Sequence, residues 1–277
     1  AMQASFTIGP AVGGLLYGLS SNVPYAVAFV LFAAAAVPAH STVAYVLERR
    51  GTWTLGNADA SLAPGQKLPA GGVVRRRSAS PDDYITIANL QSKVIASQNC
   101  SSNCSGSISL PRASSTSGPR TWFQAVMATV FASPYSDDSN LIRSGGLPEG
   151  VAEYANGKVD LSSIIEPEGV QYLRWRMVRT AAAGEWGQPV KLGKDVIVSG
   201  LKPGLYEINL MRSSGSGFEP TASSWILVTT TADHEKSKAA FQEMQKAADE
   251  WESSVRPETK RLFLRAALES LAQGPPK

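Results

Sequence analysis

Few side chains in this sequence have the types and spacing that catalysis or metal binding requires. The histidines His40 and His234 lie far apart and share no motif with the cysteines, so neither a Ser-His-Asp arrangement nor a zinc site is predicted. Cys100 and Cys104 are four positions apart, which is not the spacing of redox C-x-x-C motifs. We expect a local disulfide between them in an oxidising compartment, and two free thiols in the cytosol.

Acidic pairs and glycine-containing runs add no reactive centre. Asp82-Asp83, Asp137-Asp138 and Glu166/Glu168 are expected in solvated turns, or on strands where neighbouring side chains point to opposite faces. Ser213 to Gly217 lacks the G-x-S-x-G spacing and predicts a hairpin tip, and Gly193-Lys194 is not part of a P-loop. The sequence therefore predicts a protein that is not an enzyme and that needs no cofactor or metal.

Charge is distributed very unevenly along the 277 residues, which are enough for one or two compact domains. All 26 basic and 23 acidic residues lie from Glu48 onward, and the net charge of +3 is too small to predict a nucleic-acid partner. No side chain from Ala1 to Leu47 is charged. This asymmetry predicts a lipid bilayer as one partner.

Residues 1–40 are expected to form membrane helices or an anchor. Apolar segments run from Phe6 to Leu19 and from Val23 to Ala39, and the second approaches the roughly 17–25 residues that cross a hydrocarbon core. The first segment is short and lies at the start of the chain, so we expect it to be the tail of a longer helix. Small residues and a proline suit packing between membrane helices, and these candidate packing residues are Gly9, Pro10, Gly13 and Gly14.

The run Gly9-Pro10-x-x-Gly13-Gly14 resembles the fifth-helix motif of major facilitator superfamily exporters, with Ser5 where that family has glycine. The resemblance continues through the second apolar segment and implies helices five and six of such an exporter, inserted in the inner membrane. Two spans cannot enclose a transport path by themselves. The alternative is an export signal ending at Val37-Pro38-Ala39, although no positive charge precedes it.

Residues 41–112 are predicted to form a small β-barrel or sandwich. Val43–Leu47, Tyr84–Ala88 and Val94–Ala96 are candidate strands, separated by turns that contain glycine. Gly51-Thr-Trp53 and Leu62 to Val74 resemble the start of a FecR-type sensor domain, with Ser92 in place of the family's usual glycine. The resemblance implies a periplasmic module that takes part in signalling across the inner membrane.

The arginines after the apolar segments give two further expectations. Arg49, Arg50 and the run Arg75, Arg76 and Arg77 favour the cytoplasmic side, whereas the FecR resemblance favours the periplasmic side, which we take as the expectation. Arg75 to Arg77 form a candidate contact surface for acidic headgroups or a partner. A plain solvated turn is the alternative.

Residues 113–150 are expected to hold a linker and one helix. Ser101 to Gly118 is rich in Ser, Gly and Pro and is predicted to be a mobile linker. Pro119 suits the first turn of a helix that ends before Ser133-Pro134. Its apolar stripe is predicted to be core, and contains Trp122, Val126, Met127, Val130 and Phe131.

Residues 151–231 are predicted to form a β-sandwich, with Trp175 and Trp225 in its core. Leu201-Lys-Pro-Gly-Leu-Tyr206 resembles the fibronectin type III corner, in which a tyrosine hydroxyl bonds back to the chain. The leucine and tyrosine are one residue closer than in that family, so an immunoglobulin-like sandwich of another topology is equally expected. Residues 232–277 show two apolar stripes separated at Pro257 and predict a helical hairpin, which packs on the β-modules or, alternatively, on another chain.

The predicted fold class is thus a mainly β soluble part with N-terminal membrane helices and a C-terminal α-hairpin. The predicted function is a membrane-tethered, non-catalytic protein of the cell envelope whose β-modules bind or sense a macromolecular partner, with a protein as the expected partner. The alternative from another class is a fragment of, or fusion to, a major facilitator superfamily exporter. An enzyme without a recognisable motif is the third alternative.

Overall fold

A computed structural model describes residues 42–102, 104–112, 120–132, 145–166, 171–179, 182–215, 217–251 and 254–274. The chain divides into two units at Ser41/Thr42. The predicted membrane helices of residues 1–40, with Gly9, Pro10, Gly13 and Gly14, lie outside the described residues. Among the described helices, none combines the length and the apolar character that a membrane crossing requires. The predicted fold class is corrected accordingly: the described structure is mainly β with three helices and no membrane helix.

The first β-module consists of two small sheets that face one another. The strands are β1 (Thr42–Arg50), β2 (Trp53–Leu55), β3 (Lys67–Pro69), β4 (Val73–Arg76), β5 (Tyr84–Asn89), β6 (Val94–Asn99) and β7 (Ser107–Ser109). One sheet has the order β3-β1-β5-β6 and the other β2-β4-β7. Their shared core contains Ala44, Val46, Trp53, Leu62, Leu68, Val74, Ile85, Ile87, Ile108 and Leu110.

Strand β1 is buried on both faces. Ala44 and Val46 face the core of the module, whereas Tyr45 and Leu47 face the helices. Side chains alternate between the two faces of a strand, so a strand covered on both sides needs a continuous apolar run. The run Val43–Leu47 is apolar throughout, so the outer face of β1 packs against the helices.

The predicted linker from Ser101 to Gly118 is wrong for its first part. Strand β7 lies inside it and pairs with β4. Ile108 and Leu110 are buried in the module core. Ile108 and Leu110 are two positions apart, so their side chains point to the same face and fill the core. The segment therefore forms the third strand of the small sheet although serines surround these two residues.

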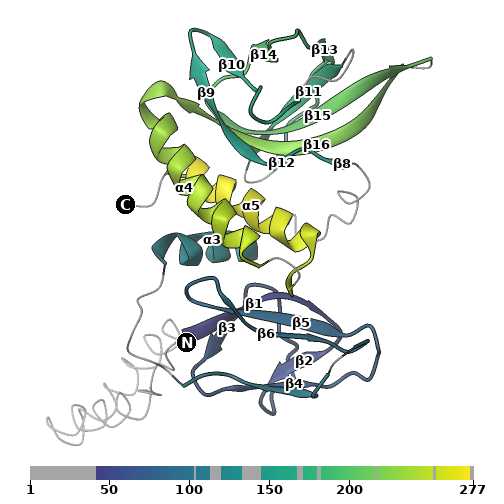
Figure 1. Ribbon diagram of the computed structural model, residues 1–277, viewed down its shortest axis with the longest axis vertical. Helices are drawn as coiled ribbons and strands as arrows, with labels where there is room; N and C mark the ends of the chain where they lie inside the picture. The colour runs from purple at the N-terminus through teal and green to yellow at the C-terminus, as the bar shows by residue number, and fades with distance from the viewer. Residues whose placement is uncertain are drawn as a thin grey trace, which may run out of the picture. The chain divides into compact units, whose positions relative to one another are not determined.

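The second β-module is a single nine-stranded sheet (Figure 1). Its strands are β8 (Gly145–Gly146), β9 (Gly150–Ala155), β10 (Lys158–Asp160), β11 (Tyr172–Arg179), β12 (Ala182–Ala183), β13 (Val190–Lys191), β14 (Ile197–Ser199), β15 (Gly204–Ser214) and β16 (Gly217–Thr230). The main path has the order β12-β11-β15-β16-β9-β10-β14. Strand β16 pairs in parallel with both β8 and β9. The prediction of an immunoglobulin-like or fibronectin-like sandwich is therefore wrong, because those folds have two antiparallel sheets.

The predicted tyrosine corner is present as a local feature of this different sheet. The Tyr206 hydroxyl accepts a hydrogen bond from the Lys202 backbone N–H at 3.2 Å. Leu201 is buried beside it in the core of the second module. The corner is therefore a way to fix the entry of β15, and it does not specify the sandwich topology.

Three helices form a layer between the two β-modules (Figure 1). They are α3 (Thr121–Ala132), α4 (Thr231–Asp249) and α5 (Pro257–Ala272). The expected C-terminal hairpin is confirmed, since α4 and α5 pack on each other and on the β-strands. Pro257 occupies the first turn of α5, where its missing N–H has no intrahelical partner to lose.

One hydrophobic core runs through this layer and joins all three parts of residues 42–277. Tyr45 and Leu47 enter it from the first module, and Leu205 and Trp225 enter it from the second. The helices and the turn after α4 supply its centre with Trp122, Phe123, Val126, Met127, Phe241, Met244, Trp251, Phe263, Ala267 and Leu268. The helix layer therefore buries the outer face of each β-module at the same time.

Candidate functional site

A cavity of about 230 Å³ lies at the junction of the two β-modules and the helix layer, and we call it the junction cavity. It takes side chains from every part of the described structure. The lining residues are Leu47, Glu48, Arg49, Pro64, Tyr84, Met127, Val130, Arg176, Glu207, Trp225, Trp251, Thr259, Leu262, Phe263, Arg265, Ala266 and Glu269. Apolar cavities with a few polar groups at defined places are the usual form of small-molecule sites.

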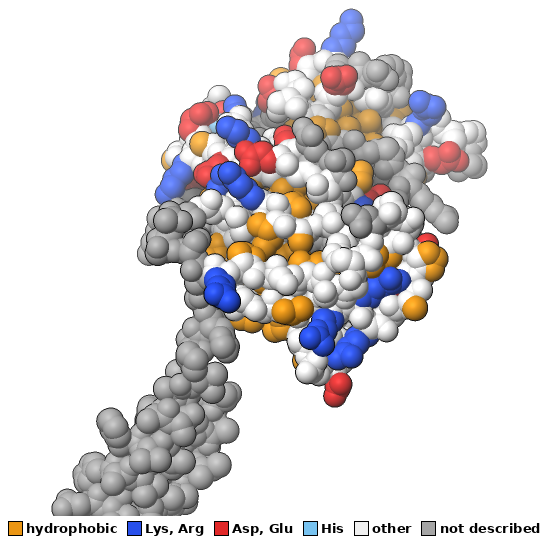
Figure 2. Space-filling model, turned by 60° about the horizontal axis from the view of Figure 1, so that its bottom comes forward, with side chains coloured by type: hydrophobic (Ala, Val, Ile, Leu, Met, Phe, Trp, Pro, Cys, Tyr) orange, Lys and Arg blue, Asp and Glu red, His pale blue; other side chains and the backbone are white. Residues whose placement is uncertain are grey.

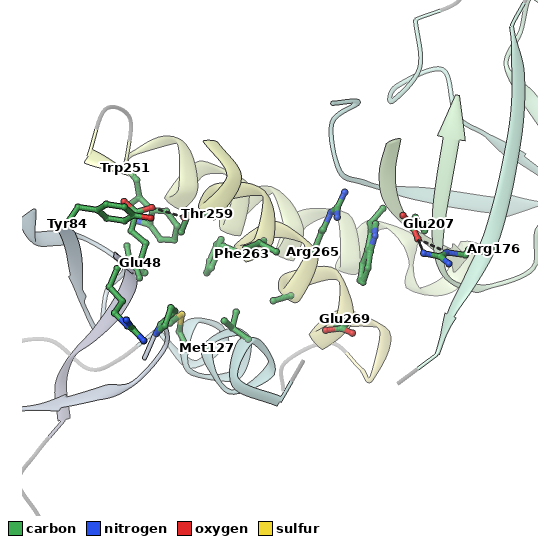
Figure 3. A pocket seen from close by; sticks show the side chains of 17 residues that line it. Glu48, Tyr84, Met127, Arg176, Glu207, Trp251, Thr259, Phe263, Arg265 and Glu269 are labelled. Atoms are coloured by element: carbon green, nitrogen blue, oxygen red, sulfur yellow. Dashed lines mark hydrogen bonds and ion pairs between the residues drawn. The ribbon is translucent and has the colours of Figure 1, made fainter. Parts of the chain in front are cut away.

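Polar side chains lie at the two ends of the junction cavity, and the residues between them are mainly apolar, with Arg265 and Glu269 toward the second end. Figure 3 shows Glu48, Tyr84 and Thr259 at one end and the Arg176–Glu207 pair at the other, with Met127 and Phe263 between them. Helix α5 runs along this row and contributes Thr259, Phe263 and Ala266 at helical spacing. The cavity therefore suits an elongated ligand whose middle is apolar.

At the first end, Glu48 connects strand β1 to the beginning of α5. Its carboxylate accepts hydrogen bonds from Thr259 Oγ1 at 2.6 Å, from Thr86 Oγ1 at 3.0 Å and from the Arg256 N–H at 3.4 Å. The free N–H groups of a helix N-terminus favour a negative charge there. Glu48 is buried and well satisfied, so it has a structural part at this end.

At the second end, α5 is held to the second sheet by arginines and glutamates. Glu149 Oε1 accepts from Arg261 Nε at 2.8 Å and from Arg265 Nε at 3.2 Å. Arg176 and Glu207 stand opposite each other in the register of β11 and β15, and Arg176 Nε donates to Glu207 Oε2 at 2.6 Å. Glu207 follows Leu205 at period 2 and so faces the helix layer.

Burial shifts the pKa of two groups in the junction cavity. Burial lowers the pKa of the Arg265 guanidinium, and the nearby Glu149 carboxylate opposes this shift. Burial raises the pKa of Glu269 above the usual range of a glutamate. Both shifts mean that the surroundings disfavour the charged form of these side chains.

The walls between the two ends consist of aromatic and aliphatic side chains. Phe263 meets Trp251 with ring centroids 4.7 Å apart and Phe123 at 6.2 Å. Arg265 lies over the Trp225 ring at 5.4 Å, so its charge also faces an aromatic surface. Rings with few side-chain torsions give a cavity whose shape is set before a ligand enters.

The lining contains no histidine, cysteine or serine among the described residues. Of its three glutamates, Glu48 and Glu207 are hydrogen-bonded to protein groups, and Glu269 is the third. No cluster of three metal-ligating side chains occurs among the described residues. A second depression of about 480 Å³ lies beside Thr86 and Ser254, and these two are bonded to each other.

The predicted contact surface Arg75 to Arg77 is divided by the structure. Arg75 and Arg77 are exposed, whereas Arg76 turns inward and forms an ion pair with Asp83 at 2.7 Å. Figure 2 shows basic side chains gathered at one end of the first module's face. None of the three arginines is among the residues that line the junction cavity.

The two cysteines are bonded in the structure, with an S–S distance of 2.11 Å between Cys100 and Cys104. They lie at the turn after β6 and pack partly against the core of the first module. Arg76 Nη1 lies 3.4 Å from Cys104 Sγ. The disulfide therefore closes the loop beside the Arg76–Asp83 pair, away from the junction cavity.

Sequence patterns did not identify the residues of the junction cavity as a binding site. Arg261 and Arg265 are four positions apart and lie on the same side of the helix as the apolar residue Leu268. This spacing is the one sequence signal that indicates buried arginines on this helix. Glu207 sits in a strand that alternates, and such a pattern predicts a solvated face. The structure shows that both faces of β15 are covered.

Comparison with known proteins adds no relative to this description. No known family model matches the chain, and no curated protein is significantly similar to it. The resemblances to exporter helices and to FecR-type domains therefore stay predictions.

Proposed function

We propose that this protein is a non-catalytic binding protein that takes a small, mostly apolar ligand in the junction cavity. The observation that carries the proposal is that one cavity is lined from both β-modules and from α5 at once. A ligand bound there contacts both β-modules and α5, so its binding energy stabilises the packing of the two modules on the helix layer. Such an arrangement suits a sensor.

Dye binding tests this proposal. The neutral apolar dye N-phenyl-1-naphthylamine is expected to become fluorescent with the wild-type chain, and Ala266→Phe is expected to abolish this signal by filling the cavity. Ala266 is 5% exposed and lines the cavity, whereas Ala239 is exposed on α4, so Ala239→Phe is the matched control that keeps dye binding. Equal dye binding by both variants would contradict the proposal.

A macromolecular partner is a second candidate, favoured by apolar side chains on the second sheet. Phe218 and Val190 are 44% and 45% exposed, and the Phe218 ring packs against Tyr172 at 4.7 Å. Exposed apolar groups that cluster are typical of protein contacts. A photo-crosslinking residue at position 218 is expected to capture one envelope protein, and the same residue at Lys158 is expected to capture none.

A further inference from the structure

The Arg265 guanidinium is buried without its full set of hydrogen bonds. The residue is 3% exposed, its Nε donates to Glu149, and its Nη2 has no hydrogen-bond partner. Leaving a charged donor buried and unpaired is costly, so such groups are nearly always satisfied by protein, water or ligand. Arg265 lines the junction cavity, and an oxygen of a bound molecule is the missing kind of acceptor.

The ion pairs around Arg265 also favour an anionic ligand. The ion pairs at this end join three arginines, Arg176, Arg261 and Arg265, to two glutamates, Glu149 and Glu207. Glu269 also lines the cavity, is half-buried, and forms no ion pair with another described residue. An anion bound at Arg265 would therefore meet more arginines than glutamates among the paired groups around it.

A second arginine of the lining provides the comparison. Arg49 Nε also lacks a hydrogen-bond partner, while Arg49 Nη1 donates to the Gly51 carbonyl at 2.8 Å. Arg49 is only half-buried, so water compensates much of its charge. The stronger demand for an anion therefore lies at Arg265.

We propose that the ligand of the junction cavity is a medium-length aliphatic carboxylate whose carboxylate group accepts a hydrogen bond from Arg265 Nη2. The inference rests on the proposed function, since it names the class of ligand for the same cavity. The aliphatic chain lies along α5 over Phe263 and Met127. The carboxylate supplies the acceptor that Arg265 Nη2 lacks, and a cavity of about 230 Å³ is below the usual range for drug-sized ligands, which favours a chain of no more than medium length.

Calorimetric titration of the full chain with four ten-carbon probes tests the head group. Decanoate is expected to bind about tenfold to a hundredfold more tightly than 1-decanol, which is the range for a hydrogen bond to a charged group. Decyltrimethylammonium is expected not to bind. Decyl phosphate binding more tightly than decanoate would overturn the carboxylate assignment, and decanol binding as tightly as decanoate would overturn the pairing with Arg265.

Substitutions then locate the charge. Arg265→Met is expected to remove the preference for decanoate over decanol, and Arg75→Met, which changes an exposed arginine outside the lining, is expected to retain it. Loss of the preference in Arg75→Met would overturn the assignment to Arg265. If Arg265→Met does not fold, Arg265→Lys keeps a positive charge but loses Nη2, and it is expected to show a weaker preference for decanoate over decanol than wild type; a preference equal to that of wild type would overturn the pairing with Arg265 Nη2.

The results also separate this inference from the proposed function. If Ala266→Phe abolishes the binding of decanol and decanoate alike while the two bind equally to wild type, the cavity is a site and the carboxylate inference is wrong. If no probe binds, or if Ala266→Phe binds both probes as wild type does, the proposed function itself is wrong.

Discussion

Asp83 shows how one buried carboxylate organises the outer end of the first module. It accepts from Ser78 Oγ at 2.6 Å and pairs with Arg76, and these contacts lower the pKa of Asp83, with the Ser78 hydroxyl as the largest cause. Gly51 has a φ of +84°, and a Cβ there would lie 2.1 Å from Asp83 Oδ1. Glycine is therefore required at this position both for its conformation and for its size.

Asp83→Asn is expected to lower the free energy of unfolding by about 1–3 kcal/mol at neutral pH. The pKa of Asp83 is lower in the folded chain than the unfolded value of about 3.9, so its contribution is present above that pH and is lost as the pH falls through the folded-state pKa. Urea unfolding measured from pH 7 down to pH 2 checks this, because the difference between variant and wild type must shrink on the acid side. A difference that is constant with pH would contradict it.

Ser92 is a second residue whose backbone conformation matters. Its φ is +63°, it is 1% exposed, and its carbonyl accepts a hydrogen bond from the Trp251 indole. Glycine, which the FecR resemblance places here, adopts this conformation without strain. The serine is tolerated because Asn89 Oδ1 accepts from the N–H groups of Gln91 and Lys93 and fixes the turn.

Ser92→Val is expected to destabilise the protein by about 1–3 kcal/mol, since a β-branched residue is strained at positive φ. Ser92→Gly is the control and is expected to stay within about 1 kcal/mol of wild type. Thermal unfolding followed by tryptophan fluorescence compares the two. Equal melting temperatures for Ser92→Val and Ser92→Gly would show that residue 92 does not adopt the strained conformation with positive φ.

At the scale of elements, α5 is the helix that both β-modules hold. Glu48 binds its beginning, and Glu149 binds its middle through Arg261 and Arg265. Helices α3 and α4 are linked beside it, because Trp122 Nε1 donates to Glu243 Oε1 at 2.9 Å. The helix layer is therefore fixed by polar contacts at its ends and by apolar packing at its centre.

Glu48→Gln is expected to lower stability by about 1–2 kcal/mol, because it removes a negative charge from the N-terminus of α5 and weakens the bond to Thr259. Hydrogen exchange of the first turn of α5 is expected to accelerate more than that of α4. Glu258→Gln removes a negative charge from a half-buried position in the same turn and is the control. Equal effects of the two changes would show that Glu48 acts only as a general charge.

For the whole molecule, the continuous core makes the two β-modules depend on the same helices. Phe263 lies at its centre, is 4% exposed and contacts the rings of Trp122, Phe123 and Trp251. A cavity at such a point removes packing from both modules at once. Residues 42–277 are therefore expected to unfold in one transition.

Phe263→Ala is expected to cost about 3–5 kcal/mol and to lower the protection of amide groups in β1 and β15 together. Hydrogen exchange with mass spectrometry measures both strands in one experiment. Phe218→Ala on the exposed part of β16 is the control and is expected to leave both strands unchanged. Loss of protection in one module alone would show that the modules are independent.

Local patterns in the sequence predicted the elements better than their arrangement. The apolar stripes of α4 and α5 and the alternation of β5 predicted those elements because both signals depend on residues close in sequence. The parallel pairing of β16 with β9 joins segments about 75 positions apart and leaves no local signal. The same holds for the junction cavity, where Arg265 meets the second sheet only after α5 has returned between the modules.

The order of the elements along the chain has a consequence for biosynthesis. Helix α5 leaves the ribosome after both β-modules, yet it completes the core that contains Tyr45 and Leu47 of one and Trp225 of the other. Until α5 emerges, each nascent module exposes an apolar face that promotes aggregation or chaperone binding. Translation slowed or halted before Pro257 should therefore yield an aggregation-prone intermediate, even though every strand has already been made.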